Sequence, residues 1–405
     1  MWRPAVAPII APMVSKTLET RIKQAALETG AAVVGIGARE RLNDAPPSGD
    51  PSYLLASTRS IIAFAIPYDR TVLRNYFAKA DWRSQGDDKK RVQQTLYRIN
   101  DRLVDLLKAE GFEALGVDGN CVYRPEDGAE DVTDMTDFYP DFSHRYGAIA
   151  AGLGRLGWSG NLITPDYGSA VALGTVLTSA VLPSDPLCET HPCDGCKLCA
   201  TVCPVEMMDR KKSVTVRVAG MIDEIAAKRP NTCCFIGCSD YHGASVNGKW
   251  SNWTPYRVAG PLPADKAELD ALCMSTQKAD PMMHLETNMY TDYRASIFDP
   301  ETHEYAACGH CANICWKDRA ERVENRRVIV NAGVVALRMD GSRTTVAEDD
   351  ALELDTPFAV SVIVVKSEYA ALKEGRITVH EGSGLFPKDR EVIAHIVKTA
   401  REEAC

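Results

Sequence analysis

CDGCKLCATVCP, residues 193–204, is the most informative segment of the chain. Its cysteines, Cys193, Cys196, Cys199 and Cys203, follow the spacing C-x2-C-x2-C-x3-C-P of bacterial ferredoxins. In that pattern the first three thiolates bind one cubane cluster and the fourth reaches another. A structural zinc site would use cysteine pairs separated by a longer loop, so zinc is disfavoured. The segment therefore predicts 4Fe-4S clusters.

A shorter copy of the pattern lies further along the chain. Cys308, Cys311 and Cys315 repeat C-x2-C-x3-C, with Trp316 where the proline would stand. Because the fourth thiolate of each run reaches the other cluster, Cys315 joins the first three cysteines of the other run, and Cys203 joins Cys308 and Cys311. Two cubanes need eight thiolates, and the two runs supply seven.

The eighth thiolate has to come from a cysteine outside the two runs. We expect Cys238 or Cys233, and the alternatives are Cys234, Cys273 and, less plausibly, Cys188. Some of the middle cysteines are then buried free thiols. Eight thiolates leave no iron open to a substrate, so we expect another group to accept the electrons.

Length and composition are those of an ordinary globular protein. The 405 residues suggest two or three domains, and the 14 cysteines are too dilute for a disulfide scaffold. The net charge of −9 argues against a broad grip on nucleic acid and favours small molecules or proteins as partners. No apolar run is long enough to span a bilayer, and residues 1–14 contain three prolines and no twin arginine. We expect a cytoplasmic protein that does not contact a membrane.

Hydrophobic periodicity predicts an α/β or α+β fold. Helices are expected at residues 17–29, 91–110 and 389–403. Strands are expected at residues 32–36, 61–66, 112–115, 170–182, 328–330 and 358–365. The acidic, turn-rich residues 117–141 are interpreted as a loop that approaches a site. The glycines of residues 147–161 indicate close approach to a flat ligand or a tight junction of the chain.

The chain resembles the cobalamin-dependent iron–sulfur reductases, which include epoxyqueuosine reductases and reductive dehalogenases. The resemblance lies in residues 30–36, 56–62, 151–161, 168–169 and 173–178, and continues into the ferredoxin run. It implies an α/β (α+β) fold in which a nitroreductase-like corrinoid-binding domain precedes a ferredoxin-like domain with two 4Fe-4S clusters.

The resemblance also implies domain boundaries. The corrinoid-binding domain would span residues 1–185, and the two-cluster domain residues 186–325, with a long insertion at about 231–305. That insertion is expected either to cap a pocket or to form a small subdomain. A C-terminal α/β extension would span residues 326–405.

A cobalamin would lie flat against backbone and small side chains. The expected cofactor-binding residues are Gly152, Gly154, Gly157, Trp158, Ser159, Gly160, Asn161, Thr164, Gly168 and Ser169. A reduction also needs a proton donor. In epoxyqueuosine reductases an aspartate stands a fixed distance before a glycine–tryptophan pair, so the resemblance implies Asp141 as the first choice. Tyr139, Tyr146 and His144 are the other candidates.

The resemblance implies a reductase, and three functions remain open. We expect reductive dehalogenation or deoxygenation of a small molecule, with electrons from a ferredoxin or flavodoxin. The first alternative is epoxyqueuosine reduction on tRNA, which the acidic charge and the unrecognised tail make less expected. The second is a non-catalytic electron-transfer or corrinoid-handling protein. An enclosed pocket that contains Asp141 or a tyrosine would favour an enzyme.

Overall fold

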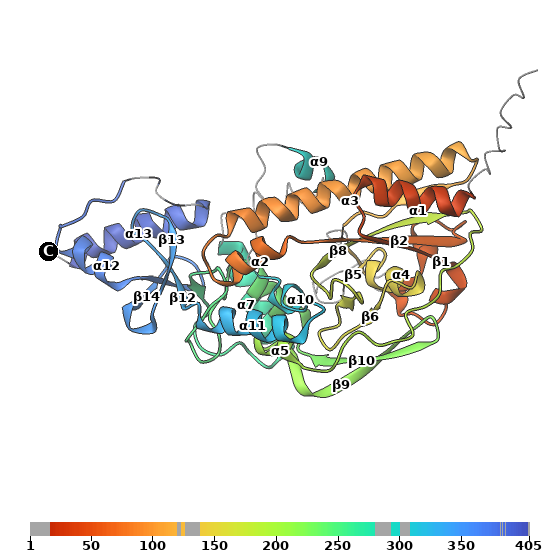
Figure 1. Ribbon diagram of the computed structural model, residues 1–405. Coiled ribbons are helices and arrows are strands. Elements are labelled where there is room, and N and C mark those ends of the chain that lie inside the picture. Colours follow the sequence, from red (N-terminus) through yellow and green to blue (C-terminus); the bar gives the residue numbers. More distant parts are fainter. Residues whose placement is uncertain are drawn as a thin grey trace, which may run out of the picture.

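The computed structural model describes residues 17–119, 123–125, 138–279, 293–299, 308–380, 382, 384 and 386–403 (Figure 1). A four-stranded antiparallel sheet forms the N-terminal part, in the order β1-β2-β8-β3. Its strands are β1 (Val33–Ala38), β2 (Ser60–Pro67), β8 (Val171–Thr178) and β3 (Ala114–Gly116). Seven of the eight residues of β2 are buried, because helices cover both faces of the sheet.

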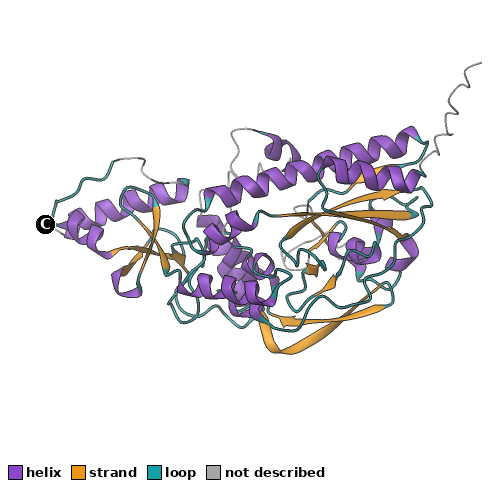
Figure 2. Cartoon of the chain, in the orientation of Figure 1, coloured by secondary structure: helices purple, strands orange, loops and turns teal. Residues whose placement is uncertain are grey.

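The long helix α3 (Arg83–Ala109) and α1 (Leu18–Thr29) lie along one face of this sheet (Figure 2). On the other face, α4 (His144–Ala150) packs against β2 and β8. The Thr17 hydroxyl caps α1 by accepting from the Thr20 amide, and Gly30 at φ +123° ends the helix. Helix α2 (Arg70–Phe77) follows β2.

Short elements connect the sheet to the cysteine segments. They are β4 (Tyr123–Pro125) with β5 (Phe138–Pro140), β6 (Arg155–Leu156) with β7 (Leu162–Ile163), α5 (Leu198–Thr201) and α10 (His310–Asn313). A long hairpin, β9 (Met208–Val218) with β10 (Met221–Lys228), runs along the lower edge of the view in Figure 1. Short 3-10 turns span Arg39–Leu42, Pro47–Gly49, Pro51–Tyr53 and Glu348–Asp350.

Most of the remaining elements belong to a second α/β unit, whose helices are α6 (Asn231–Cys238), α7 (Lys266–Ala279), α12 (Lys366–Lys373) and α13 (Pro387–Glu403). Helix α9 (Tyr293–Phe298) packs against α3, and α11 (Arg319–Asn331) packs against α2 and α5. The strands of the second unit are β11 (Tyr256–Arg257), β12 (Val334–Leu337), β13 (Arg343–Val346), β14 (Ala351–Asp355) and β15 (Ser361–Val365). Together these strands form one sheet.

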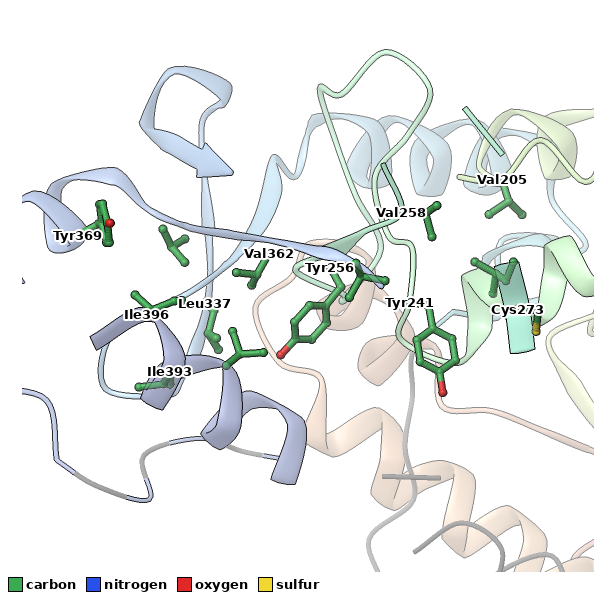
Figure 3. Close-up of a cluster of buried hydrophobic side chains, with 14 of the residues drawn as sticks. Val205, Tyr241, Tyr256, Val258, Cys273, Leu337, Val362, Tyr369, Ile393 and Ile396 are labelled. Atoms are coloured by element: carbon green, nitrogen blue, oxygen red, sulfur yellow. The ribbon is translucent and has the colours of Figure 1, made fainter. Parts of the chain in front are cut away.

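The C-terminal residues and the insertion share one hydrophobic core (Figure 3). Val205, Tyr256 and Cys273 pack in the same cluster as Val362 and Ile393. In addition, β11 from the insertion pairs with β15 from the tail. The packing of these described residues therefore extends across residue 326, the boundary that the sequence predicts.

Most of the expected elements are present, with one error. The helices expected at 17–29, 91–110 and 389–403 correspond to α1, α3 and α13. Residues 328–330 were expected to form a strand, but they lie inside helix α11. Asp318 caps this helix, and buried Ile329 packs its apolar face, so tertiary packing overrides the strand preference of the β-branched run. Among the described residues, no helix is both long and apolar enough to cross a membrane.

Candidate metal centre

The first cysteine run lies in a loop that leads into α5. Gly195 and Lys197 both have positive φ, at +67° and +59°, which turns the chain between successive cysteines. The Asp194 carboxylate accepts from the Cys196 amide and pairs with buried Arg322 of α11 at 2.6 Å. The loop of the first cysteine run is therefore fixed to α11, the helix that follows the second cysteine run in the chain.

The second cysteine run packs against the turn at residues 168–169. The Ser169 amide donates to the Cys315 carbonyl oxygen at 2.8 Å, and the Ser169 hydroxyl donates to the Ala312 carbonyl oxygen at 2.8 Å. Gly309 begins α10 at φ +89°. The two cysteine runs are thus brought together by a segment of the N-terminal part.

Four half-buried thiols form a first group, Cys193, Cys196, Cys199 and Cys315. Burial, together with the neighbouring thiols of Cys315, Cys311 and Cys193, raises the pKa of the Cys199 thiol to about 12. Burial likewise raises the pKa of Cys315 to about 11. Such thiols ionise only where positive charge is supplied, as bound iron would do.

The second thiol group contains Cys203, Cys308 and Cys311 with two thiols from α6. Burial raises the pKa of the Cys203 thiol, and its charged neighbours are Cys308, Cys311 and Cys234. Burial also raises the pKa of Cys311 to about 12, again with Cys234 and Cys308 as neighbours. Cys311 interacts electrostatically with Cys199 of the first group and Cys203 of the second, and all three pack against one hydrophobic cluster, so the groups adjoin each other.

The arrangement suits clusters better than a single metal ion. All twelve cysteines among the described residues are free thiols. Within those residues, no three cysteine, histidine or acidic side chains converge on one metal position. A zinc ion would need its thiolates about 2.3 Å away, whereas a cubane spreads its thiolates over four irons. The thiol groups therefore fit two 4Fe-4S clusters.

Helix α6 decides which cysteine completes the second group. Cys234 and Cys238 lie four residues apart on one face, with their sulfurs 3.7 Å apart. Cys233 points into the hydrophobic core and is fully buried there. The expectation of Cys233 as a ligand is therefore corrected, since its thiol lies on the other side of the helix. Cys273 is buried in the same core as Cys233.

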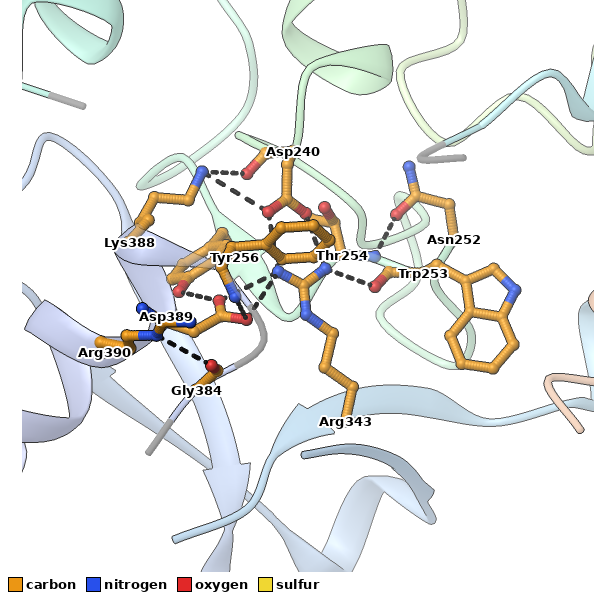
Figure 4. Close-up of polar contacts among 11 residues, drawn as sticks. Asp240, Asn252, Trp253, Thr254, Tyr256, Arg343, Gly384, Lys388, Asp389 and Arg390 are labelled. Carbon is orange, nitrogen blue, oxygen red and sulfur yellow. Dashed lines mark hydrogen bonds and ion pairs between the residues drawn. The ribbon is translucent and has the colours of Figure 1, made fainter. Parts of the chain in front are cut away.

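The end of α6 is held by a buried ion network (Figure 4). Asp240 pairs with Arg343 at 2.9 Å, and its carbonyl oxygen accepts from the Lys388 ammonium at 3.0 Å. Arg343 also pairs with Asp389, which accepts from the Tyr256 hydroxyl at 2.7 Å. The side chains of Asp240, Asp389, Arg343 and Lys388 are at most 3% exposed. Residues from the tail thus fix the helix that presents Cys234 and Cys238.

The glycine segment packs closely against the rest of the chain. A β-carbon at Gly152 would lie 2.1 Å from the Pro186 carbonyl oxygen, and one at Gly154 would lie 2.1 Å from the Ile163 carbonyl oxygen. One at Gly157 would meet the Ile163 side chain at 2.2 Å. These glycines permit close packing of the chain on itself, which is reason enough for their residue type, and their contact with a corrinoid stays a prediction.

The other residues expected to bind a corrinoid close turns or lie near the thiols. Trp158 donates to the Asp209 carbonyl oxygen and packs beside Cys193 and Cys199, with the Lys197 ammonium 3.8 Å from its ring centre. Trp158 and Ser159 line a small hollow among the first thiol group.

Asn161, Thr164 and Gly160 have similar places. The Asn161 amide nitrogen lies 3.8 Å from the Cys311 sulfur. The Thr164 hydroxyl donates to the Gly168 carbonyl oxygen at 3.0 Å. A β-carbon at Gly160 would lie 2.6 Å from the Lys228 ammonium. The segment therefore surrounds the thiols.

The candidate proton donors have different places. His144 is buried, with Nε2 2.8 Å from the Asp118 carbonyl oxygen and Nδ1 2.9 Å from the Thr175 hydroxyl. Nε2 must donate to the carbonyl, so Nδ1 accepts, and neither nitrogen is available to a substrate. His144 is therefore corrected from a candidate donor to a core residue. Tyr146 is half-buried and packs beside Gly49.

Asp141 is half-buried between β5 and α4 and remains a predicted donor. The backbone of Tyr139 lies in β5, opposite Arg124. Sequence reasoning noted Arg145 as a basic residue near the candidate tyrosines but missed Lys228. Arg145 donates to the Gly160 carbonyl oxygen. Burial, together with the Arg145 charge, lowers the pKa of the Lys228 ammonium, and both cations lie near Cys234.

Comparison with known proteins relates part of the chain to epoxyqueuosine reductases. The enzyme of Bacillus cereus is 30% identical over 165 residues, which cover 38% of this chain and 37% of the relative. The enzyme of Synechococcus sp. (strain RCC307) is 46% identical over 57 residues, which cover 14% of this chain and 18% of the relative. The matches thus span 37% and 18% of the lengths of these relatives. Over that part, the relationship indicated by the sequence motifs is confirmed.

Solved structures are more distant. Epoxyqueuosine reductase from Bacillus subtilis is 14% identical, with a TM-score of 0.40. The match covers 96% of this chain and 93% of the Bacillus subtilis chain. A reductive dehalogenase whose structure suggests a mechanism for B12-dependent dehalogenation is 14% identical, with a TM-score of 0.43. The match covers 77% of this chain and 37% of the dehalogenase chain. At these TM-scores the structural likeness carries no argument about this chain. No family model matches the chain.

Proposed function

We propose that this chain is a two-cluster iron–sulfur reductase that works with a corrinoid and reduces the epoxide of epoxyqueuosine in tRNA. The pair of adjoining thiol groups carries the proposal. Two clusters held entirely by thiolates pass electrons one at a time and leave no iron open to a substrate. Adjoining clusters therefore suit delivery of electrons to a separate reacting group.

The corrinoid part of the proposal comes from the resemblance in sequence motifs. A bound corrinoid supplies a cobalt centre reactive enough to reduce carbon–oxygen or carbon–halogen bonds. The glycines of residues 152–157 pack against the chain itself, and their contact with the corrinoid stays a prediction. Cobalt analysis is therefore part of the test.

The chain's own residues have three roles in this proposal. Cys238 supplies the eighth thiolate, because its thiol is hydrogen-bonded to the Cys308 thiol, whereas Cys234 only lies near Cys203, Cys308 and Cys311. Arg145 and Lys228 place positive charge beside the second cluster, where they offset the negative charge of its thiolates. Asp141 would donate a proton to the epoxide oxygen, which leaves as water after two electrons and a second proton from solvent have been supplied.

The curated relatives favour tRNA over a small halogenated or oxygenated molecule as substrate, although we expected the small molecule. One feature of the fold also supports tRNA. Lys211, Lys212 and Arg217 are exposed along the hairpin strand β9. They give this element a local positive charge within an acidic chain, which suits contact with phosphates.

The test begins with anaerobic purification in the presence of cobalamin. We expect about eight irons and one cobalt per chain, and conversion of epoxyqueuosine to queuosine in tRNA, measured by nucleoside mass spectrometry. Asp141→Asn should keep its iron and cobalt and lose conversion. Lys211→Glu with Lys212→Glu should weaken tRNA binding and reduce its salt dependence.

Eight irons without cobalt under any loading condition would rule out the corrinoid reaction and leave an electron-transfer protein. Cobalt binding with turnover of a small halogenated compound, and none of tRNA, would instead support the small-molecule alternative. Asp141→Asn with unchanged conversion would remove Asp141 as the proton donor. Each outcome separates one part of the proposal from the others.

A further inference from the structure

A groove of about 470 Å³ opens beside the second thiol group. It is lined by residues from the start of β9, from the loop at residues 245–250 and from α11. Cys203, one of the thiols of the second group, forms part of its wall. The groove therefore gives a bound molecule access to the edge of a cluster site.

The groove is positively charged although the chain is acidic. Arg210, Lys249 and Arg326 line it together with one carboxylate, that of Glu206. The Arg326 guanidinium is held by a 2.9 Å hydrogen bond to the Thr201 hydroxyl. Arg210 and Glu206 are 4.0 Å apart and more than half exposed, so their pairing is weak. With a net charge of −9 on the whole chain, this local excess of cations favours a negatively charged partner.

Aromatic packing connects the groove wall to the second cysteine run. Trp250 lines the groove and packs against His310, with ring centres 6.3 Å apart. His310 lies between Cys308 and Cys311 in the chain and is 2% exposed. A partner in the groove would thus meet Cys203 of the second thiol group directly on one side. On another side, one layer of packed rings would separate it from Cys308 and Cys311.

The rim of the groove is partly apolar. Val246 is 73% exposed at the groove, an unusual position for a large aliphatic side chain. Cations around an apolar contact are typical of small, transient protein interfaces, in which charge guides the encounter. Nucleic acid phosphates would use the cations but would gain little from Val246 or from lying beside Cys203. A protein partner accounts for more of these features.

We propose that this groove is the docking site of an acidic one-electron carrier protein, which reduces the second cluster through the Cys203 side. In each encounter the carrier loses one electron and the cluster gains one, and no bond or proton is exchanged. The inference rests on the proposed function only in requiring that the two clusters are present. It adds the place where electrons enter.

The test compares two ways of reducing the cluster-loaded protein. Stopped-flow absorbance would follow cluster bleaching by a photoreduced acidic bacterial ferredoxin, and separately by photoreduced deazaflavin, a small reductant that needs no docking surface. We expect Arg210→Glu with Lys249→Glu to slow the ferredoxin reaction about tenfold or more near 0.15 M salt and to leave the deazaflavin reaction unchanged. Val246→Asp should slow the ferredoxin reaction without removing a cation.

A matched control reverses two exposed cations on α13, Lys398→Glu with Arg401→Glu, and should leave both rates unchanged. Calorimetry with oxidised ferredoxin gives a second readout, in which the groove variant should bind more weakly and the control should not. Equal ferredoxin rates and affinities in the groove variant and the wild type would overturn the proposal. Weakened tRNA binding with an unchanged ferredoxin rate would also overturn it and assign the groove to RNA. Failure of deazaflavin to bleach the wild type would instead contradict the clusters themselves.

Discussion

Gly168 lies against the backbone of Cys315, so that a β-carbon on Gly168 would come within 1.9 Å of the Cys315 carbonyl oxygen. The two residues are far apart in sequence, and the 2.8 Å hydrogen bond from the Ser169 amide to the same oxygen joins their segments. Position 168 thus supports the loop that brings Cys315 to the first thiol group.

Replacing Gly168 by alanine should therefore release iron from the first cluster. The β-carbon would push the Cys315 backbone away, in addition to a strain of about 1–2 kcal/mol for an alanine at φ +67°. Iron analysis and electron paramagnetic resonance of the reduced protein would measure the loss. Gly375→Ala is the matched control, because Gly375 has the same φ of +67° and open space around it. Equal iron in the two variants would contradict the supporting role of Gly168.

The three cysteines of α6 should behave differently when each is changed to serine. Cys238→Ser should lose most of the iron of the second cluster, because its thiol is hydrogen-bonded to Cys308, and Cys234→Ser should retain it. Cys233→Ser should keep its iron but lower the free energy of unfolding by about 1–3 kcal/mol, because it buries a hydroxyl in an apolar core. Iron content and denaturant unfolding distinguish the three. Iron loss in Cys234→Ser with none in Cys238→Ser would move the ligand by one helical turn.

Removal of Arg343 should be the most destabilising charge change tested. Arg343→Met leaves the buried carboxylates of Asp240 and Asp389 without their guanidinium, at a cost of about 3–5 kcal/mol. Arg338→Met, which breaks a half-exposed pair with Glu368, should cost no more than about 1 kcal/mol. Denaturant unfolding of the two variants gives the comparison. A cost below about 1 kcal/mol for Arg343→Met would show that the network does not hold the end of α6.

Acid should destabilise the fold through His144. Burial lowers the pKa of His144 to about 4, below its ordinary value of about 6.5 in an unfolded chain. The unfolded state therefore binds the proton first as the pH falls, and stability decreases between about pH 6.5 and pH 4. Between pH 7 and pH 5 the loss from this residue should be about 2 kcal/mol.

The measurement is the free energy of unfolding at pH 7 and pH 5 for the wild type and for His144→Gln. The variant should be less stable at pH 7 and should show a smaller loss at pH 5. His380→Gln, at an exposed position, is the control and should follow the wild type. An unchanged pH dependence in His144→Gln would mean that His144 does not stay neutral in the fold.

Local spacing explains why the two cysteine runs could be recognised before the structure was considered. Ligands three or four residues apart lie in one loop, so their chemistry is encoded in neighbouring positions. The helices α1 and α13 were predictable for a similar reason, since each has its own apolar face. The prediction of a strand at residues 328–330 was wrong because three apolar residues fit a strand and a buried helix turn equally well.

The choice among Cys233, Cys234 and Cys238 needed the tertiary structure. Each residue of a helix is rotated about 100° from the one before, so Cys233 and Cys234 face different sides of α6. Which side meets the cysteine runs depends on Asp240, held by Arg343 from the distant tail. No local pattern contains that relationship.

The sequence alone was sufficient for the cysteine runs, the mixed α/β class and the relationship to iron–sulfur reductases, because all three are written in short-range patterns. Only the tertiary structure decided that the glycines of residues 152–157 pack against the chain, that His144 is a core residue, and that a basic groove opens beside Cys203. These features arise where segments far apart in sequence exclude water from one another or leave a space between them. Burial and close contact of that kind depend on the whole fold.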